Sequence, residues 1–150
     1  MEETTNYLQD LEQEINLDPA TPGIRFLNLI IDTAVYYALT FVSGILYGLY
    51  LVKTDGQMDE GGSTQLVLLV LALIPYLLYY SLMEAFAGGR TIGKMATGTY
   101  VVQTNGEAVS FGKAFLRTII RFVPFEPFSM LGGRPWHDSW TDTVVVKKSR

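Results

Sequence analysis

Two uncharged stretches decide the fold of this chain: residues 33–52, TAVYYALTFVSGILYGLYLV, and residues 66–83, LVLLVLALIPYLLYYSLM. At a helical rise of about 1.5 Å per residue they reach about 30 and 27 Å, close to the hydrocarbon thickness of a bilayer. A soluble protein would have to bury both helices on all sides, and a chain of 150 residues leaves too little sequence for that. We therefore predict two membrane spans, at about residues 24–52 and 65–87. Pro75 is compatible with the second span because neighbouring helices can satisfy the carbonyl that proline frees.

Charge is distributed unevenly along the chain, whose formal net charge is −4. Residues 1–23 hold six acidic residues and no basic one, which predicts an acidic N-terminal tail. Residues 53–65, between the spans, carry one lysine beside three acidic residues, whereas residues 89–150 carry nine basic residues and four acidic ones. Because lysine and arginine accumulate on the cytoplasmic side of spans, we expect the connection outside and both termini in the cytoplasm.

Composition also excludes several classes of function. No basic patch stands outside an apolar context, so we expect no nucleic-acid partner. The chain has no cysteine and one histidine, His137, so we expect no metal site. Asp138 and Asp142 would lie one turn apart in a helix, but no base or nucleophile accompanies them. We therefore predict no catalytic residue, no cofactor and no enzyme activity.

The residues after the second span predict a small cytoplasmic antiparallel sheet. Residues 99–103 and 107–110 favour β-structure and flank Asn105-Gly106, a pair that is typical of hairpin turns, so a hairpin is predicted at residues 99–110. A lone hairpin is only marginally stable, and we expect residues 143–147 to add a third strand.

A basic amphipathic helix is predicted between these strands, at residues 111–123. Its two faces carry Lys113, Arg117 and Arg121 on one side and Phe115, Ile119 and Phe122 on the other. Three cations and the prolines that follow argue against a third span, so we expect an interfacial helix at the level of the lipid headgroups. Together with Arg90 and Lys94, its cations are predicted to contact anionic headgroups.

Charged residues from distant parts of the chain are expected to meet at the inner edge of the hydrocarbon. Asp32 directly precedes the first uncharged stretch, and Glu84 directly follows the second. An unpaired carboxylate at this depth is costly, which predicts one partly desolvated charge network. Its members are Arg25, Asp32, Glu84, Arg117, Arg121 and Asp138. Two roles remain open for it: a proton or cation site, and a structural clamp that fixes helix packing.

Three segments in this order resemble the RDD family, small bacterial membrane proteins named for an arginine and two aspartates. They are Arg25-FLNLII-Asp32, residues 89–94 (GRTIGK) and Trp136-His137-Asp138. The resemblance implies that Arg25, Asp32 and Asp138 hold the three signature positions. It further implies an RDD-like domain at residues 24–150 in the bacterial cytoplasmic (inner) membrane.

The resemblance also implies that transport, including cation/proton exchange, is a candidate activity. This chain departs from larger members after Arg121, where a third span is often drawn and where its own sequence is short and broken by proline.

The sequence therefore leaves two candidate functions. The first is a module that associates with itself or with a larger membrane complex, because two spans cannot enclose a pathway. Ser43, Gly44 and Gly48 offer the small surfaces that helix approach requires. The second is proton-coupled cation transport by an oligomer, with Asp32 as the carboxylate whose protonation changes.

Overall fold

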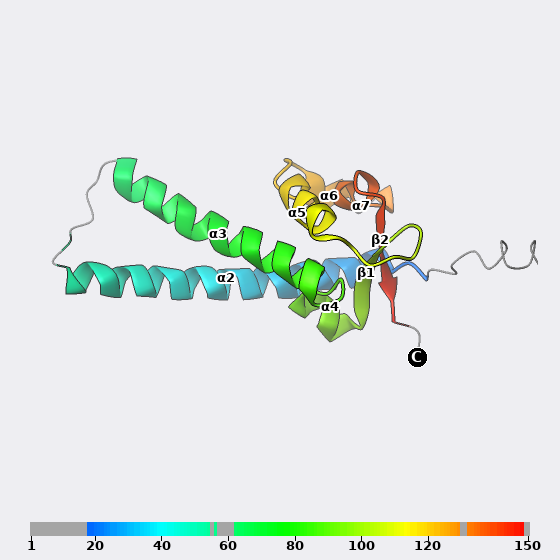
Figure 1. Ribbon diagram of the computed structural model, residues 1–150, viewed down its shortest axis with the longest axis horizontal. Coiled ribbons are helices and arrows are strands. Elements are labelled where there is room, and N and C mark those ends of the chain that lie inside the picture. Colours follow the sequence, from blue (N-terminus) through cyan, green and yellow to red (C-terminus); the bar gives the residue numbers. More distant parts are fainter. Residues whose placement is uncertain (1–17, 55, 57–61, 130–131, 149–150) are drawn as a thin grey trace, which may run out of the picture.

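Two long helices, α2 (Pro22–Lys53) and α3 (Gly62–Phe86), form a hairpin that projects from a group of shorter elements (Figure 1). This computed structural model describes residues 18–54, 56, 62–129 and 132–148, so residues 1–17 of the predicted acidic tail lie outside the described residues. Both helices are long and apolar enough to cross a membrane. The two predicted apolar helices are therefore present, with bounds that differ by a few residues from those expected.

The shorter elements, which we call the head region, occupy residues 87–148. In chain order they are α4 (Ile92–Thr97), β1 (Thr99–Gln103), α5 (Phe111–Ile120), α6 (Glu126–Ser129), α7 (Trp136–Ser139) and β2 (Thr143–Lys147). Helix α4 packs against α2, and α5 packs against α3 and α7. The head region is thus attached to both helices of the hairpin at one end.

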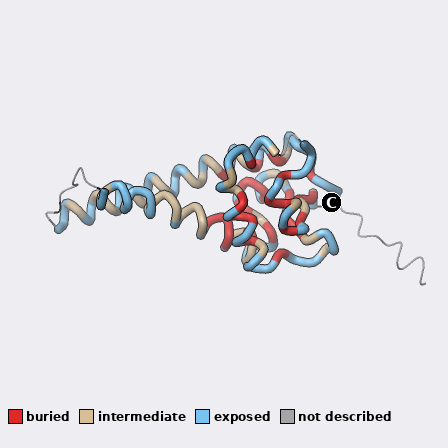
Figure 2. The backbone as a smooth tube through the Cα atoms, turned by 90° about the horizontal axis from the view of Figure 1, so that it is seen from above, coloured by how far each residue is buried: buried red, intermediate tan, exposed pale blue. Residues whose placement is uncertain are grey.

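Burial separates the hairpin from the head region. Buried residues gather in the head region and at the adjoining end of the hairpin, while the rest of the hairpin is exposed or half-buried (Figure 2). In the most apolar stretches of α2 and α3, only 6% and 17% of residues are buried. A core helix of a soluble protein would be mostly buried, so these exposed apolar surfaces are those of helices that face lipid or another membrane helix.

Helix α2 begins inside the head region and continues into the apolar hairpin. Pro22 lies in its first turn, where proline loses no hydrogen bond, and Thr21 before it is extended. The residues of α2 that are buried, Arg25, Asn28 and Asp32, all lie in its first eleven residues and are polar. One continuous helix therefore supplies both polar groups to the head region and apolar surface to the membrane.

The sheet is a two-stranded antiparallel ribbon in which β1 pairs with β2, from Thr99 opposite Lys147 to Gln103 opposite Thr143. The predicted small antiparallel sheet is confirmed, but the predicted hairpin at residues 99–110 is not a two-stranded unit. Its turn forms, with Gly106 at φ 83° donating to the carbonyl of Gln103. Beyond the turn only Ala108 bridges to β1, because the chain then enters α5 with Ser110 as N-cap.

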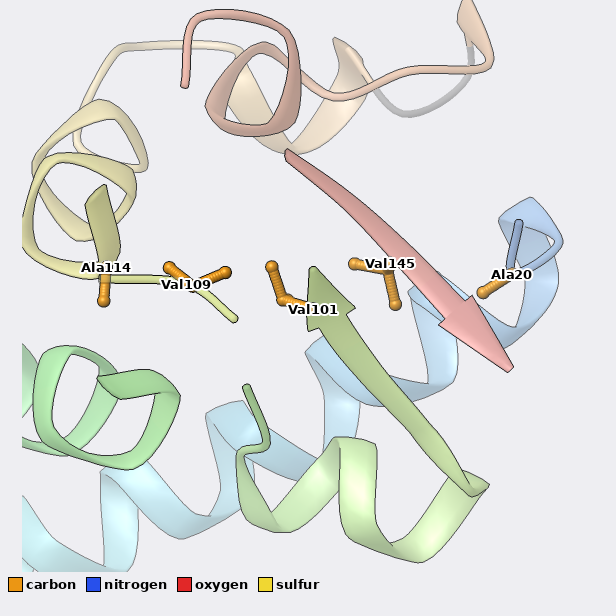
Figure 3. Close-up of a cluster of buried hydrophobic side chains, with 5 residues drawn as sticks. All are labelled: Ala20, Val101, Val109, Ala114 and Val145. Carbon is orange, nitrogen blue, oxygen red and sulfur yellow. The ribbon is translucent and has the colours of Figure 1, made fainter. Parts of the chain in front are cut away.

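The apolar core of the head region is small. Its members are Ala20, Val101, Val109, Ala114 and Val145, drawn in Figure 3. They come from the segment before α2, from both strands, from the loop after the turn and from α5. Most other buried side chains in the described residues are polar or charged, so polar contacts carry much of the packing.

Helix α5 ends at Ile120, three residues before the end of the predicted helix. Pro124 disfavours helical backbone at the residue before it, and the following turn holds Phe125 at φ 67°. Phe125 is 75% exposed, so this strained turn directs an aromatic ring away from the protein.

Candidate functional site

Arg117 of α5 lies at the centre of a buried chain of ion pairs. Its side chain is fully buried. Its Nε donates to Glu84 Oε2 of α3 at 2.7 Å, and its Nη1 donates to Asp138 Oδ1 of α7 at 2.5 Å. One guanidinium group thus joins the end of the second long helix to the C-terminal part of the head region.

The chain of ion pairs extends in both directions from Arg117. Arg25 of α2 pairs with the second oxygen of Asp138, and its Nε donates to the carbonyl of Ala20 at 3.0 Å. Lys94 of α4 pairs with Glu84 Oε1, which also accepts from Arg121 Nη2 at 3.1 Å. The sequence predicted that Arg25, Glu84, Arg117, Arg121 and Asp138 would gather, and the structure places all five together, with Lys94 as a sixth member.

Asp32 lies outside this network, which corrects the expectation of one shared site. Its carboxylate is buried and accepts hydrogen bonds from the Tyr79 hydroxyl at 2.7 Å, the Thr91 hydroxyl at 2.6 Å and the Gly93 backbone N–H at 2.7 Å. No ion pair to Asp32 occurs among the described residues. Neutral donors therefore satisfy this carboxylate in place of a cation.

The first turn of α4 explains this arrangement. Thr91 caps the helix, and the N–H of Gly93 is one of the amides that a helix start leaves without an internal partner. A Cβ at Gly93 would lie 2.5 Å from the Asn28 carbonyl and 2.8 Å from Asp32 Oδ1. Only glycine lets α4 approach α2 so closely. Sequence reasoning treated residues 89–94 as part of the family resemblance and missed these donors.

Asn28 is a second polar contact of α2 that sequence reasoning missed. Its amide nitrogen donates to Thr99 at 3.0 Å, and its amide oxygen accepts from Thr97 at 2.5 Å. Asn28 lies one turn before Asp32, so the two polar side chains share a face of α2.

The structure corrects part of the predicted headgroup contact. Arg117 and Lys94 are 0% and 3% exposed and both pair with Glu84, so neither side chain lies on the outer surface of the protein. The ring of Tyr80 lies 4.7 Å from the guanidinium carbon of Arg121, whose side chain is 12% exposed. Lys113 donates to Gln103 at 2.8 Å, and Arg90 lies over the ring of Tyr100. Headgroup contact therefore stays a prediction for Lys113 and Arg90.

Helix α5 turns its charged face inward and its apolar face outward. Its buried residues are Ala114, Arg117, Thr118 and Ile120. The exposed large side chains of the same segment are Phe111, Phe115, Leu116, Ile119 and Phe122. This orientation is the reverse of a basic helix that lies on a membrane surface with its cations toward solvent.

His137 and Glu126 form a further buried pair next to the network. His137 Nδ1 contacts Glu126 Oε1, and its Nε2 lies 3.4 Å from Asp138 Oδ1. Burial and the nearby guanidinium groups of Arg121 and Arg117 hold the pKa of His137 well below its ordinary value of 6.5. The imidazole is therefore neutral, and burial raises the pKa of Glu126 above its ordinary value.

The network groups of the head region remain ionised at neutral pH. Burial opposes ionisation of Asp138, but Arg117 and Arg25 outweigh it and hold its pKa below the ordinary value of 3.8. Burial lowers the pKa of Lys94 to about 8, although Glu84 favours the charged form. The ammonium group of Lys94 thus loses its proton closer to neutrality than an exposed lysine does.

A cavity of about 50 Å³ opens beside these groups. Its wall includes Arg25, Asp32, Lys94, Arg121, Glu126 and His137. A volume of this size has room for a few water molecules. No group of three acidic or histidine side chains that could hold a metal ion occurs in the part of the chain that the structure describes.

The model of the RDD family matches residues 19–145, most of the chain. The chain belongs to the RDD family. RDD proteins are small membrane proteins, so this RDD chain is a membrane protein with two exposed apolar helices. Comparisons with curated proteins and with solved structures gave no match.

The three positions implied by the RDD resemblance divide into two sites. Arg25 and Asp138 pair directly, although 113 residues separate them in the sequence. Asp32 instead binds the start of α4 and Tyr79 of α3. In this RDD protein the arginine and the second aspartate connect α2 to α7, while the first aspartate connects α2 to α4 and α3.

Proposed function

We propose that this RDD protein is a non-enzymatic membrane module whose hairpin associates with further membrane helices, from a second copy or a larger complex. The observation that carries the proposal is the open small surface on α2. A Cβ added at Gly44 or Gly48 would meet nothing within 4 Å, so α3 does not use these glycines for packing. Small residues one turn apart allow a second helix to approach closely in lipid.

Within the described chain, no other helix packs against the face of α2 that carries Gly44 and Gly48. Helices α2 and α3 contact each other near the head region, through Tyr36 against Tyr76 and Asp32 against Tyr79, and diverge toward Lys53 and Gly62 (Figure 1). Two divergent helices leave most of their apolar surface for lipid or for other helices. The head region supports this arrangement as a structural clamp that fixes the base of the hairpin.

Substitution on the glycine face tests the proposal. Gly44→Leu should lower the oligomeric fraction of protein extracted in mild detergent, because the added side chain keeps a partner helix away. Ala38→Leu is the matched control: Ala38 is also exposed on α2, about 120° around the helix from Gly44. Native mass spectrometry of both variants provides the readout. A wild-type protein that is only monomeric and brings no other membrane protein with it would refute the proposal.

We further propose that the protein lies in the bacterial inner membrane with the head region and both termini in the cytoplasm. The nine basic residues in the range 89–150, against one lysine in the connection between the helices, support this orientation. In this arrangement α5 lies in the cytoplasmic leaflet. Its outward face of Phe115, Leu116 and Ile119, each more than 40% exposed, then contacts lipid tails while its cations stay in the network.

Proton-coupled cation transport by an oligomer is a second candidate, and the place of Asp32 favours it. The Asp32 carboxylate is 3% exposed, forms no ion pair in the described residues and borders the cavity. Protonation there would remove a charge that no cation balances directly. Proteoliposomes with an imposed pH gradient test this function. Cation-dependent dissipation should be lost in Asp32→Asn and kept in Asp142→Asn, an exposed carboxylate; equal dissipation in both variants would exclude the role of Asp32.

A further inference from the structure

The ion-pair network leaves hydrogen-bond donors without partners beside the cavity. Arg121 lines the cavity, and its Nε is buried with no hydrogen-bond partner among the described residues; Nη2 of the neighbouring Arg117 is in the same state. The ammonium group of Lys94 also lines the cavity and, in the described chain, makes one hydrogen bond, to Glu84. A buried N–H group without an acceptor destabilises the folded protein. An acceptor from outside the chain would therefore stabilise these donors.

Three of the four carboxylate oxygens in the cavity wall are engaged by protein groups. Both oxygens of Asp32 accept hydrogen bonds, from Tyr79, Thr91 and Gly93. Glu126 Oε1 is in contact with His137 Nδ1. Arg25, the third cation that lines the cavity, already pairs with Asp138 and donates a hydrogen bond to the carbonyl of Ala20. The unsatisfied hydrogen-bonding capacity of the cavity therefore belongs mainly to the donors of Lys94 and Arg121.

We propose that this cavity binds one phosphate-type oxyanion, held by Lys94 and Arg121. Tetrahedral oxyanions present several acceptor oxygens, and guanidinium groups bind them through forked N–H donors. The anion is either free phosphate or the phosphate of an anionic lipid headgroup. Pro127 lines the cavity, and its near neighbours in the sequence, Phe125 and Phe128, are 75% and 67% exposed and offer an apolar surface to acyl chains, which favours the lipid.

Thermal unfolding of the full chain in phosphatidylcholine nanodiscs tests the free ion. Raising inorganic phosphate at constant ionic strength, with chloride as the balancing anion, should raise the unfolding midpoint saturably, because a ligand that binds only the folded state stabilises it. The lipid is tested by native mass spectrometry of protein from nanodiscs that contain phosphatidylglycerol. Retention of phosphatidylglycerol in preference to phosphatidylcholine assigns the lipid source, and a phosphate effect alone assigns the free ion.

Two variants make the assignment specific to the cavity. Leu29→Trp fills the cavity without changing a charge and should weaken anion binding about tenfold or more, whereas Leu27→Trp, an exposed neighbour on α2, should not. Arg121→Lys keeps the charge but removes the forked donors, and it should weaken binding while leaving a folded protein by gel filtration. A wild-type protein without either effect would show that the cavity holds only water and would overturn the proposal. Binding unchanged in both Leu29→Trp and Arg121→Lys would place the anion outside the cavity and would overturn it as well.

Discussion

Arg117 is the residue on which the ion pairs of the head region converge. It pairs with Glu84 and Asp138 at once. Glu84 is also held by Lys94 and Arg121, and Asp138 is also held by Arg25. Loss of Arg117 would remove the one cation that both carboxylates share, together with its buried hydrogen bonds, and breaking a buried ion pair by removing one partner is strongly destabilising. Arg117 should therefore be far less replaceable than Lys113, the other cation of α5.

Arg117→Met should lower the free energy of unfolding by about 3–5 kcal/mol, because it removes a charge from two buried carboxylates. Lys113→Met on the same helix is the control: Lys113 is only partly buried and donates to Gln103, so its loss should change stability by about 0.5 kcal/mol or less. Denaturant titration in detergent measures both. Equal stability losses in the two variants would contradict the central position of Arg117.

His137 gives the stability of the protein a specific pH dependence. Its folded pKa lies well below the ordinary 6.5, so protons bind the unfolded chain more strongly and stability is lost as pH falls below 6.5. The loss from this residue should reach at most about 1.4 kcal/mol per pH unit. Glu126, whose pKa is raised, acts in the opposite direction.

His137→Gln isolates this contribution, because the chain has no other histidine. Between pH 6.5 and 5, the unfolding midpoint of the wild type should fall relative to that of the variant. Parallel pH profiles of the two proteins would show that His137 is protonated in the folded state.

At the scale of elements, the contact between α4 and α2 depends on Gly93. The short helix approaches α2 closely enough for its first turn to bind Asp32, and any side chain at position 93 would meet backbone and carboxylate oxygens.

The position of helix α5 depends on polar contacts. Its packing against α3 is fixed by buried Arg117 and Thr118, while its apolar face remains outside.

Gly93→Ala should destabilise the protein by about 1–3 kcal/mol, the usual cost of forcing an extra carbon into a filled contact. Gly112→Ala in α5 is the matched control, because a Cβ there would meet nothing within 4 Å and alanine favours the helix. Thermal unfolding of both variants distinguishes them. A Gly93→Ala protein as stable as Gly112→Ala would mean that α4 does not depend on this close approach.

At the scale of the whole molecule, the protein divides into an apolar hairpin and a head region with a mainly polar interior. The division appears in Figure 2 as a change from exposed and half-buried residues along the hairpin to buried residues where it meets the head region. The proposed orientation places the connection between the helices outside the cell and β2 inside it.

Single cysteines test this orientation without background labelling, because the chain contains no cysteine. Gly56 and Lys148 are both exposed: Gly56 follows the end of α2 in the connection between the long helices, and Lys148 follows β2 in the head region. A membrane-impermeant maleimide should label Gly56→Cys in intact spheroplasts and Lys148→Cys only after permeabilisation. The reverse pattern would invert the proposed topology.

The apolar helices could be predicted from the sequence because an uncharged run of spanning length is a local signal. The two strands could be predicted from their β-favouring residues, but the turn at Asn105-Gly106 indicated the wrong neighbour for β1, which pairs with β2. The gathering of Arg25 and Asp138 in one network could be predicted because an unpaired charged side chain at the inner edge of the hydrocarbon is costly. The partners of Asp32 could not be predicted, since they are two hydroxyls and one backbone N–H, and backbone groups carry no sequence signal. The direction in which α5 faces was missed for a related reason. Its two faces are evident, but the choice between them depends on Glu84 and Asp138, which are distant in sequence.

The continuity of α2 has a mechanical consequence. Its 32 residues extend for about 48 Å without a proline after Pro22, so no proline kink separates its apolar part from the head region. A rotation of α2 caused by a neighbouring helix at Gly44 would therefore also displace Asn28 and Asp32, whose hydrogen bonds to the residues around α4 depend on their position. Binding or release of a partner helix within the bilayer would in this way weaken or strengthen the hydrogen bonds between α2 and α4. No hinge within α2 would be needed to carry this change from the membrane to the head region.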